Sequence, residues 1–187
     1  HTAFQEKNPL VSFTIHSGNS DNIKERIERG LLDVGLLQEP VDISKYSFVR
    51  TPCREQWGVL VREDSELASR ERVSPADLAS VPLILPEREI VQNELLNWFG
   101  PYAEGLRITA TGNLLYNLAS LARASGGSVL TLNLDCTYEG LRFIPLSPPL
   151  ESNTVLVWKK TQTFSAAAAA LIEFSEKYIS GMEQNLI

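Results

Sequence analysis

Apolar positions along the chain follow two periods, one typical of strands and one typical of helices. Every second position of residues 11–15 is apolar, which predicts a strand. Residues 23–31 then carry an apolar side chain at every fourth position, as a helix does, and residues 33–37 form a short apolar run that predicts a second strand. A strand, a helix and a strand within so short a stretch predict a βαβ unit with parallel strands and a right-handed crossover.

The helix of this unit has clear signals at both ends. Asn19 or Ser20 can cap its N-terminus, Asp21 suits the positive end of the helix dipole, and Gly30 can end the helix. These polar residues follow directly on the predicted strand. The turn between strand and helix is therefore short and polar.

The alternation continues to the end of the chain. Further strands are predicted at residues 46–50, 56–61, 81–85, 107–110, 128–132, 141–145 and 154–158. Further helices are predicted after Ser74, where Pro75 and Asp77 complete a capping box, and at residues 91–98, 114–122 and from about 163 onward. The last helix is expected to pack through one apolar stripe, made of Phe164, Ala168, Leu171, Tyr178 and Met182.

Two breaks divide this pattern, a polar one at residues 62–66 and a proline-rich one at residues 145–149. We expect lobe I to consist of residues 1–50 and 152–187, and lobe II of residues 51–151. The predicted fold class is α/β, with two Rossmann-like lobes. Two lobes joined by two chain crossings are expected to leave a ligand cleft between them.

Composition and charge argue against several classes of protein. The 187 residues carry 17 Lys and Arg against 23 Asp and Glu, a net charge of −6 that argues against nucleic-acid binding by this chain itself. No apolar run has the roughly 18–20 residues of a membrane span, so no membrane partner is expected. The start of the chain has no features of a signal peptide. Because the chain begins with His1 rather than Met, we expect a fragment or a processed chain.

Catalytic and metal-binding motifs are missing from the sequence. There is no G-x-S-x-G, phosphate-binding loop, H-E-x-x-H or C-x-x-C motif, and the only histidines are His1 and His16. We therefore expect no catalytic residue, no metal and no cofactor. Cys53 and Cys136 are the only cysteines, and we expect two buried free thiols in a reducing cytoplasm rather than a disulfide or a Cys53 nucleophile.

Two similar turns are the candidates for ligand binding. Residues 17–19 read Ser-Gly-Asn and residues 111–113 read Thr-Gly-Asn, each between a predicted strand and a predicted helix. Such a turn presents free backbone N–H groups, a hydroxyl and an amide, which together can hold a small anion such as a carboxylate. The alternative is that both are ordinary helix caps with glycine in a tight turn.

Polar residues also follow two other predicted strands. Residues 38–40 and 86–88 come at the carboxyl ends of strands, where α/β proteins form ligand sites. The alternative, slightly favoured for residues 38–40, is a plain polar loop. The tryptophans are expected in the core rather than in a ligand site, namely Trp57, Trp98 and Trp158.

These segments together resemble the effector-binding domain of LysR-type transcriptional regulators. The resemblance is strongest over residues 17–40, which include IERGLLDVGLLQEP at 27–40. It continues in register through WGVLV at 57–61, DSELA at 64–68, residues 77–86, NLLYN at 113–117, GSVLTL at 127–132, FIPLSPP at 143–149 and LVWKK at 156–160. It covers essentially the whole chain, from Phe4 to about Tyr178.

The resemblance implies a fold of the type 2 periplasmic-binding-protein kind, an effector in the interlobe cleft and no catalysis. Carried over position by position, the effector contacts fall on Ser17, Asn19, Gln38, Pro86, Glu87, Thr111 and Asn113. Asn19 is the single residue we expect most strongly in the site. A neutral Gln38 indicates little about the charge of the effector.

The function that the resemblance implies is that of a cytoplasmic, ligand-sensing regulatory domain. A small metabolite would control DNA binding by the intact transcription factor, which would be a homodimer or a tetramer. DNA would be contacted only through an N-terminal winged helix-turn-helix that these residues do not include, and the first strand of lobe I is also missing from them. The alternatives are a free solute-binding protein of a transporter and, less favoured, an enzyme on the same fold.

Overall fold

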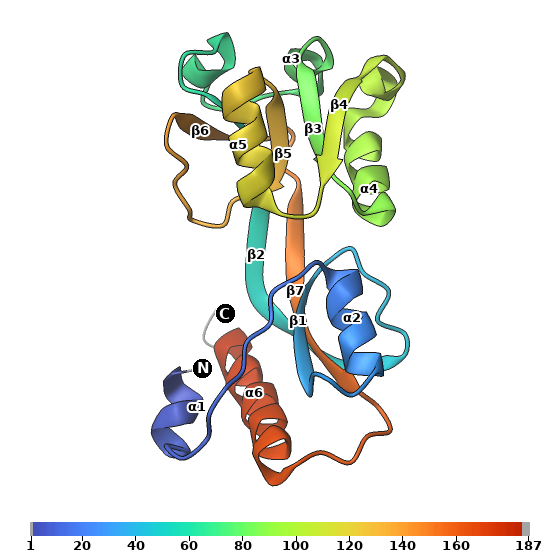
Figure 1. Ribbon diagram of the computed structural model, residues 1–187, viewed down its shortest axis with the longest axis vertical. Coiled ribbons are helices and arrows are strands. Elements are labelled where there is room, and N and C mark those ends of the chain that lie inside the picture. The colour runs from blue at the N-terminus through green and yellow to red at the C-terminus, as the bar shows by residue number, and fades with distance from the viewer. Residues whose placement is uncertain (1, 185–187) are drawn as a thin grey trace. The chain divides into compact units, whose positions relative to one another are not determined.

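The computed structural model describes residues 2–184 and divides the chain into two compact units (Figure 1). Unit 1 contains His1–Cys53 and Asn153–Ile187, and unit 2 contains Arg54–Ser152. The chain passes from one unit to the other twice, within strand β2 (Tyr46–Arg62) and within strand β7 (Glu151–Lys159).

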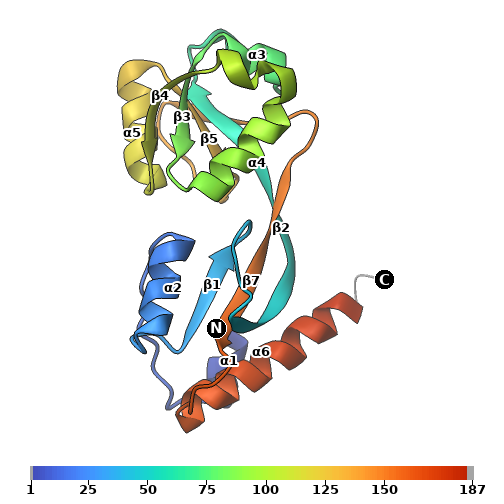
Figure 2. The same ribbon diagram turned by 90° about the vertical axis from the view of Figure 1, so that its right-hand side faces the viewer.

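Unit 1 is built on strand β1 (Val34–Gln38), which pairs antiparallel with β7 over its whole length. Helix α2 (Ser20–Glu28) and helix α6 (Ala166–Gln184) lie on opposite sides of these strands (Figure 2). Ile23 and Ile27 of α2 pack into a core with residues of β1, β2 and β7, namely Leu37, Tyr46, Val155 and Val157. A Cβ atom at position 35 would lie within 2.8 Å of both isoleucines, so only Gly35 allows α2 to approach β1 this closely.

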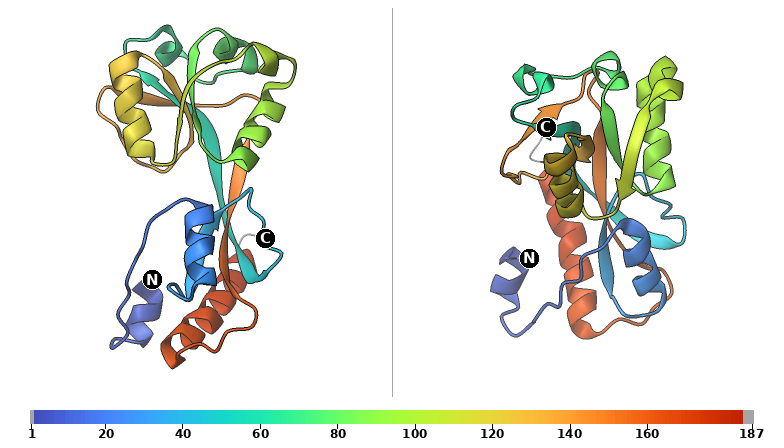
Figure 3. Two further views of the ribbon diagram at one scale, coloured as in Figure 1. Left: turned by 45° about the vertical axis from the view of Figure 1, so that its right-hand side comes forward. Right: turned by 45° about the horizontal axis from the view of Figure 1, so that its top comes forward.

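The first helix of unit 1 packs against the last one (Figure 3). Phe4 of α1 (Thr2–Lys7) is buried, and its ring meets Phe174 of α6 edge-to-face with centroids 5.4 Å apart. Phe13 contacts the same ring of Phe4 at 6.0 Å. Three aromatic rings therefore tie the start of the described chain to its C-terminal helix.

The predicted strand at residues 11–15 is wrong. These residues form no strand, and Ile15 is 81% exposed. The βαβ unit predicted for this part is wrong as well, since residues 11–15 form no strand that could pair in parallel with β1. The strand partner that β1 has is β7, and this pairing is antiparallel. The reason is physical: alternating apolar residues become a strand only where a neighbouring backbone offers hydrogen bonds.

Unit 2 contains the parallel part of the fold. Its strands follow the order β2, β5 (Ser128–Leu132), β3 (Pro82–Pro86) and β4 (Arg107–Gly112), and β6 (Leu141–Pro145) pairs with β2. β3 runs parallel to both β4 and β5, whereas β2 is antiparallel to β5 and β6. Helices α3 (Pro75–Ala79), α4 (Glu89–Phe99) and α5 (Leu115–Ser125) alternate with these strands, with short 3-10 turns at Glu66–Ser69 and Gly100–Gly105. The α/β fold class is thereby confirmed.

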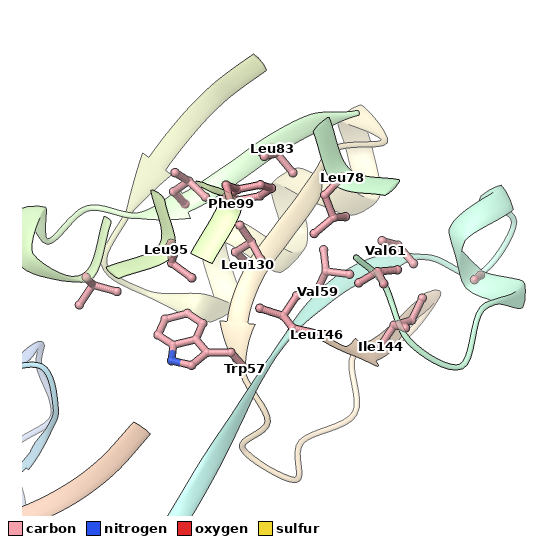
Figure 4. Close-up of a cluster of buried hydrophobic side chains, with 14 residues drawn as sticks. Trp57, Val59, Val61, Leu78, Leu83, Leu95, Phe99, Leu130, Ile144 and Leu146 are labelled. Carbon is pink, nitrogen blue, oxygen red and sulfur yellow. The ribbon is translucent and has the colours of Figure 1, made fainter. Parts of the chain in front are cut away.

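Two clusters of buried side chains make up the core of unit 2. The larger cluster joins the sheet to α3 and α4 and includes Val59, Leu83, Leu95, Phe99 and Leu130 (Figure 4). The smaller cluster packs α5 against the sheet through Leu60, Ile84, Ala122 and Val129. The central strands are therefore buried on both faces, as expected for strands in a parallel arrangement.

Several local predictions are confirmed. The strands at 128–132 and 141–145 have the predicted bounds, and Asn19 caps α2 by accepting a hydrogen bond from the Asn22 backbone. The strands predicted at 46–50 and 56–61 are one continuous strand, β2. Trp57 and Trp158 are buried, as predicted, whereas Trp98 is only partly buried.

The packing face of the last helix differs from the prediction. Ala168, Ile172 and Ile179 are buried, whereas Tyr178 is 51% and Met182 37% exposed. The helix starts at Ala166, so Phe164 precedes it. The run of alanines offers no contrast that marks one face from the sequence, and the buried stripe is rotated from the predicted one.

The capping box of α3 predicts a pH-dependent contribution to stability. Hydrogen bonds from the side chain and backbone of Ser74, followed by the charge of Arg70, lower the pKa of Asp77. A lowered folded-state pKa stabilises the fold above the unfolded value of about 3.9 and ceases to do so as the pH falls through the folded value. We expect Asp77→Asn to lower the free energy of unfolding by about 1 kcal/mol at pH 7 and by progressively less below pH ~4. Urea unfolding at several pH values measures this.

Glu104→Gln, which removes an exposed carboxylate from the same unit, serves as the control. If the loss in free energy of unfolding caused by Asp77→Asn stays constant down to pH ~2, the assignment of this stability to the ionised carboxylate is wrong.

Candidate functional site

In unit 1 the predicted site residues lie where α2 begins and β1 ends. Buried Ser20, the first residue of α2, donates a hydrogen bond from its Oγ to the backbone oxygen of Gln38, 3.2 Å away. Asn19 precedes it, and its Oδ1 accepts from the backbone nitrogen of Asn22 at 2.9 Å. The turn at residues 17–19 is therefore held next to the carboxyl end of β1, with Ser17 exposed.

Gln38 uses both ends of its side-chain amide inside unit 1. Its Nε2 donates to the backbone oxygen of Asn153 at 3.1 Å, and its Oε1 accepts from the hydroxyl of Thr154 at 3.1 Å. The hydroxyl of Thr51 donates a hydrogen bond to the backbone oxygen of Thr154. The structure thus shows Gln38 joining β1 to β7, so it positions the strand end instead of presenting a free amide.

The residue after Gln38 adds a charged pair to this strand end. Glu39 Oε1 accepts hydrogen bonds from Nη2 of Arg50 at 3.0 Å and from its Nε at 3.2 Å. The Arg50 guanidinium also lies over the ring of Phe48, 4.9 Å from its centroid. Because Arg50 is half exposed, this ion pair contributes little to stability.

In unit 2 the predicted residues come together at the carboxyl ends of β3 and β4. The two strands are parallel, and Pro86 is paired with Gly112. The backbone nitrogen of Glu87 donates to the backbone oxygen of Gly112 at 2.9 Å, and Gln92 Nε2 donates to that of Pro86 at 2.7 Å. Residues 86–87 and 111–113 therefore form one polar edge, which leads into the N-terminus of α4.

The second Gly-Asn turn is not a helix cap. The helix α5 begins at Leu115, its N-cap is Leu114, and no side chain donates or accepts a capping hydrogen bond there. Gly112 instead lies close to α5, since a Cβ atom would lie 2.6 Å from Cδ2 of Leu118 and would make that side chain shift. The structural equivalence of the two turns, as the sequence pattern predicts it, is therefore wrong.

The sequence pattern missed residues that organise both strand ends. In unit 1 these are Thr154 and Ser20, which the sequence pattern marked only as a possible helix cap, and both form hydrogen bonds with Gln38. In unit 2 they are Gln92 and also Asn133, which follows the third parallel strand β5 and whose backbone nitrogen donates to the oxygen of Gln56. The position of Asn133 directly after a predicted strand was the available signal. The others depend on long-range contacts.

The prediction for the two cysteines is confirmed in one part and wrong in the other. Both Cys53 and Cys136 are free thiols, as predicted, but both are exposed, whereas the prediction was that they are buried.

Within residues 2–184 no three His, Cys, Asp or Glu side chains are grouped so that they could hold a metal ion. Among the same residues, no helix is long and apolar enough to cross a membrane.

An α/β chain of two units, connected by two strand crossings and with polar residues after its strands, has the architecture of a ligand-binding domain of the type 2 periplasmic-binding-protein class. Residues 2–179 match the family model of the LysR substrate binding domain. The chain therefore belongs to the LysR substrate-binding-domain family, as the sequence resemblance predicts. This membership favours the transcriptional-regulator interpretation over a transporter component.

Individual relatives agree with this assignment. An uncharacterized HTH-type transcriptional regulator of Bacillus subtilis (strain 168), YvbU, is 28% identical over 82 residues, a match that spans 44% of this chain and 27% of that protein.

Among solved structures, the C-terminal domain of a probable LysR family transcriptional regulator from Rhodococcus sp. RHA1 superposes with a TM-score of 0.74 at 22% identity, covering 92% of this chain and 88% of that one. HinK, a LysR family transcriptional regulator from Pseudomonas aeruginosa, gives 0.77 at 18% identity, over 95% of this chain and 63% of HinK. At these identities the structures establish the fold.

Proposed function

We propose that this chain is the effector-sensing domain of a LysR-type transcription factor and that its effector is a small anionic metabolite, such as a carboxylate. The observation that carries the proposal is the family match over residues 2–179 combined with polar residues at the carboxyl ends of strands in both units. Two proteins of the same fold support it. The effector binding domain of QuiR has been solved in complex with shikimate, and the CcmR regulatory domain of Synechocystis PCC6803 with 2-PG.

The proposed effector contacts of unit 1 are Ser17 and Asn19. The turn that holds them runs into α2, whose first N–H groups have no acceptor within the helix and carry its positive dipole end. An anion is therefore favoured at this turn. Gln38 belongs to the proposed site through its hydrogen bonds to Asn153 and Thr154, which fix the strand end beside the turn.

Unit 2 is proposed to contribute its own polar edge. Thr111 and Asn113 supply a hydroxyl and an amide there, and Pro86 and Glu87 lie on the adjacent strand end. Both Thr111 and Asn113 are exposed. The two units are proposed to be the two lobes of the sensing domain.

The parts of the function that concern the intact protein are also proposals. DNA binding is assigned to a separate N-terminal winged helix-turn-helix. Full-length CbnR, a protein of the same fold, has been solved with its target DNA. The intact protein is proposed to be a cytoplasmic homodimer or tetramer. The domain itself is proposed to bind its effector without transforming it and without a cofactor.

Substitution of Asn19 tests the site. Titration calorimetry of the 187-residue chain with a panel of small carboxylates, shikimate among them, should identify at least one ligand. We expect Asn19→Ala to weaken its binding about tenfold, the loss of roughly one hydrogen bond. We expect Asn19→Asp, which keeps the helix cap, to weaken a carboxylate at least as much because it adds a like charge.

Asn117→Ala, an exposed asparagine on α5, is the matched control and should bind as the unsubstituted chain does. If no carboxylate of the panel binds, the anionic-effector proposal is wrong. If the affinity is unchanged in both Asn19 variants, Asn19 does not belong to the site.

A further inference from the structure

The side chain of Trp57, on β2, carries a buried hydrogen-bond donor that has no partner in the fold. Trp57 is 3% exposed, and among residues 2–184 no atom accepts a hydrogen bond from its Nε1–H. A buried tryptophan usually has such an acceptor. Trp98 has one, since its Nε1 donates to the backbone oxygen of Pro148 at 2.8 Å. Unpaired buried donors destabilise a fold and are rare, so the N–H of Trp57 needs an explanation.

Trp57 lies at the polar edge of unit 2 that contains the proposed effector contacts. Its register partner is Leu132, the last residue of β5. β5 runs parallel to β3, which ends at Pro86, and β3 runs parallel to β4, which ends at Gly112. Trp57 therefore stands beside the carboxyl ends of the parallel strands.

The indole of Trp57 is on the face of the sheet that α4 covers. Trp57 belongs to the same buried cluster as Val91 and Leu95 of α4. Figure 4 shows the indole extended from β2 toward Leu95, with its nitrogen on the side turned away from Leu95 and Leu130. The N–H thus points out of the cluster, at the edge of the sheet where α4 begins.

The N-terminus of α4 adds donors at the same edge. This helix has eleven residues and starts at Glu89, and its N-cap residue Arg88 makes no side-chain capping hydrogen bond. The first N–H groups of a helix have no acceptor within the helix and carry its positive dipole end. The indole N–H and the start of α4 therefore both favour an oxygen with negative charge.

We propose that Trp57 determines specificity in the effector site: its Nε1–H donates a hydrogen bond to a carboxylate oxygen of the bound effector, at the N-terminus of α4. The inference rests on the proposed function, because it assigns this donor to the anionic effector of the same domain. A buried donor selects strongly against ligands without an acceptor, since it then stays unpaired. Trp57 therefore disfavours molecules that are apolar or cationic at this position.

Nuclear magnetic resonance of the 187-residue chain follows this N–H directly. The three tryptophans give three indole signals, which the variants Trp57→Phe and Trp98→Phe assign. The probe is sodium acetate, and sodium chloride at the same ionic strength is the control. We expect acetate to move the Trp57 signal downfield and saturably at millimolar concentration, a strength within reach of so small a ligand. Chloride should leave it in place, and the signals of Trp98 and Trp158 should move with neither salt.

Replacement of Trp57 by benzothienylalanine removes the N–H and keeps the shape of the ring, because sulfur takes the place of nitrogen. We expect acetate to bind about tenfold more weakly, the loss of roughly one hydrogen bond. The Tm of the free chain should stay the same or rise, because an unpaired buried donor is removed. The same replacement at Trp98 is the matched control. It should lower the Tm through the lost hydrogen bond to Pro148 and leave the affinity for acetate unchanged.

A Trp57 signal that acetate does not move would overturn the proposal, as would equal losses of acetate affinity for the two replacements. A lower Tm after replacement of Trp57, with unchanged affinity for acetate, would overturn it too by showing that the N–H is paired inside the fold. A carboxylate that binds in calorimetry without moving the Trp57 signal overturns only the role of Trp57. The absence of binding by every carboxylate, in calorimetry and in magnetic resonance, overturns the anionic effector as well.

Discussion

Gly58→Ala is expected to lower the free energy of unfolding of unit 2 by about 3 kcal/mol, the upper part of the range for overpacked cores. A Cβ atom at this position would lie 2.5 Å from the backbone oxygen of Ile144 and closer still to the ring of Phe143. Strand β2 cannot move away, because Gly58 is paired with Thr131 of β5 on one side and with Pro145 of β6 on the other.

Urea unfolding followed by circular dichroism measures this change. Gly105→Ala is the matched control, since nothing lies within 4 Å of its Cβ position, and we expect it to stay within about 0.5 kcal/mol. The double variant Gly58→Ala with Phe143→Ala separates the two contacts, because it removes the ring but leaves the backbone oxygen. A Gly58→Ala variant as stable as Gly105→Ala would contradict the close packing of β2 on β6.

The sequence predicts unit 2 well because its signals are local. The capping box of Ser74 and Asp77 depends on contacts within one turn. The strands at 128–132 and 141–145 are apolar runs bounded by turn residues, and both have the predicted bounds. Where the determinants of an element lie inside the element, the pattern is sufficient.

Unit 1 is harder to predict because its elements depend on distant partners. Residues 11–15 have the alternating apolar pattern of a strand, but no described strand pairs with them. The neighbours of β1 cannot be derived from its own residues either, since its partner β7 comes more than 100 residues later. Likewise, the exposed residues in the middle of β2 interrupt the pattern although the strand continues through them.

The candidate site shows the same division. The rule that polar residues gather at the carboxyl ends of strands led to Gln38 and Glu87, and the structure does place them at strand ends. The rule does not predict which hydrogen bonds the side chains at these strand ends form. The amide of Gln38 is bound to Asn153 and Thr154, and Asn113 does not cap the helix that follows it.

Leu130→Ala is expected to have an effect as large as that of Gly58→Ala, by the opposite mechanism. Leu130 is fully buried in β5, where it belongs to the cluster that joins the sheet to α3 and α4. Its flanking residues are held by β2 on one side and β3 on the other, so the sheet cannot collapse into the space that the substitution leaves. Removal of such a leucine costs about 2–5 kcal/mol, the sum of lost burial and an unfilled cavity.

Leu134→Ala removes the same atoms four residues further along, at a side chain that is 51% exposed, and we expect a change within about 0.5 kcal/mol. The comparison of the two variants in urea unfolding isolates burial from composition. Because the cavity lies within unit 2, Leu130→Ala should also increase hydrogen exchange in β3 and β5 more than in β1 of unit 1. Equal losses of stability for the two leucines, or equal exchange in the two units, would show that the core of unit 2 is not the cluster around Leu130.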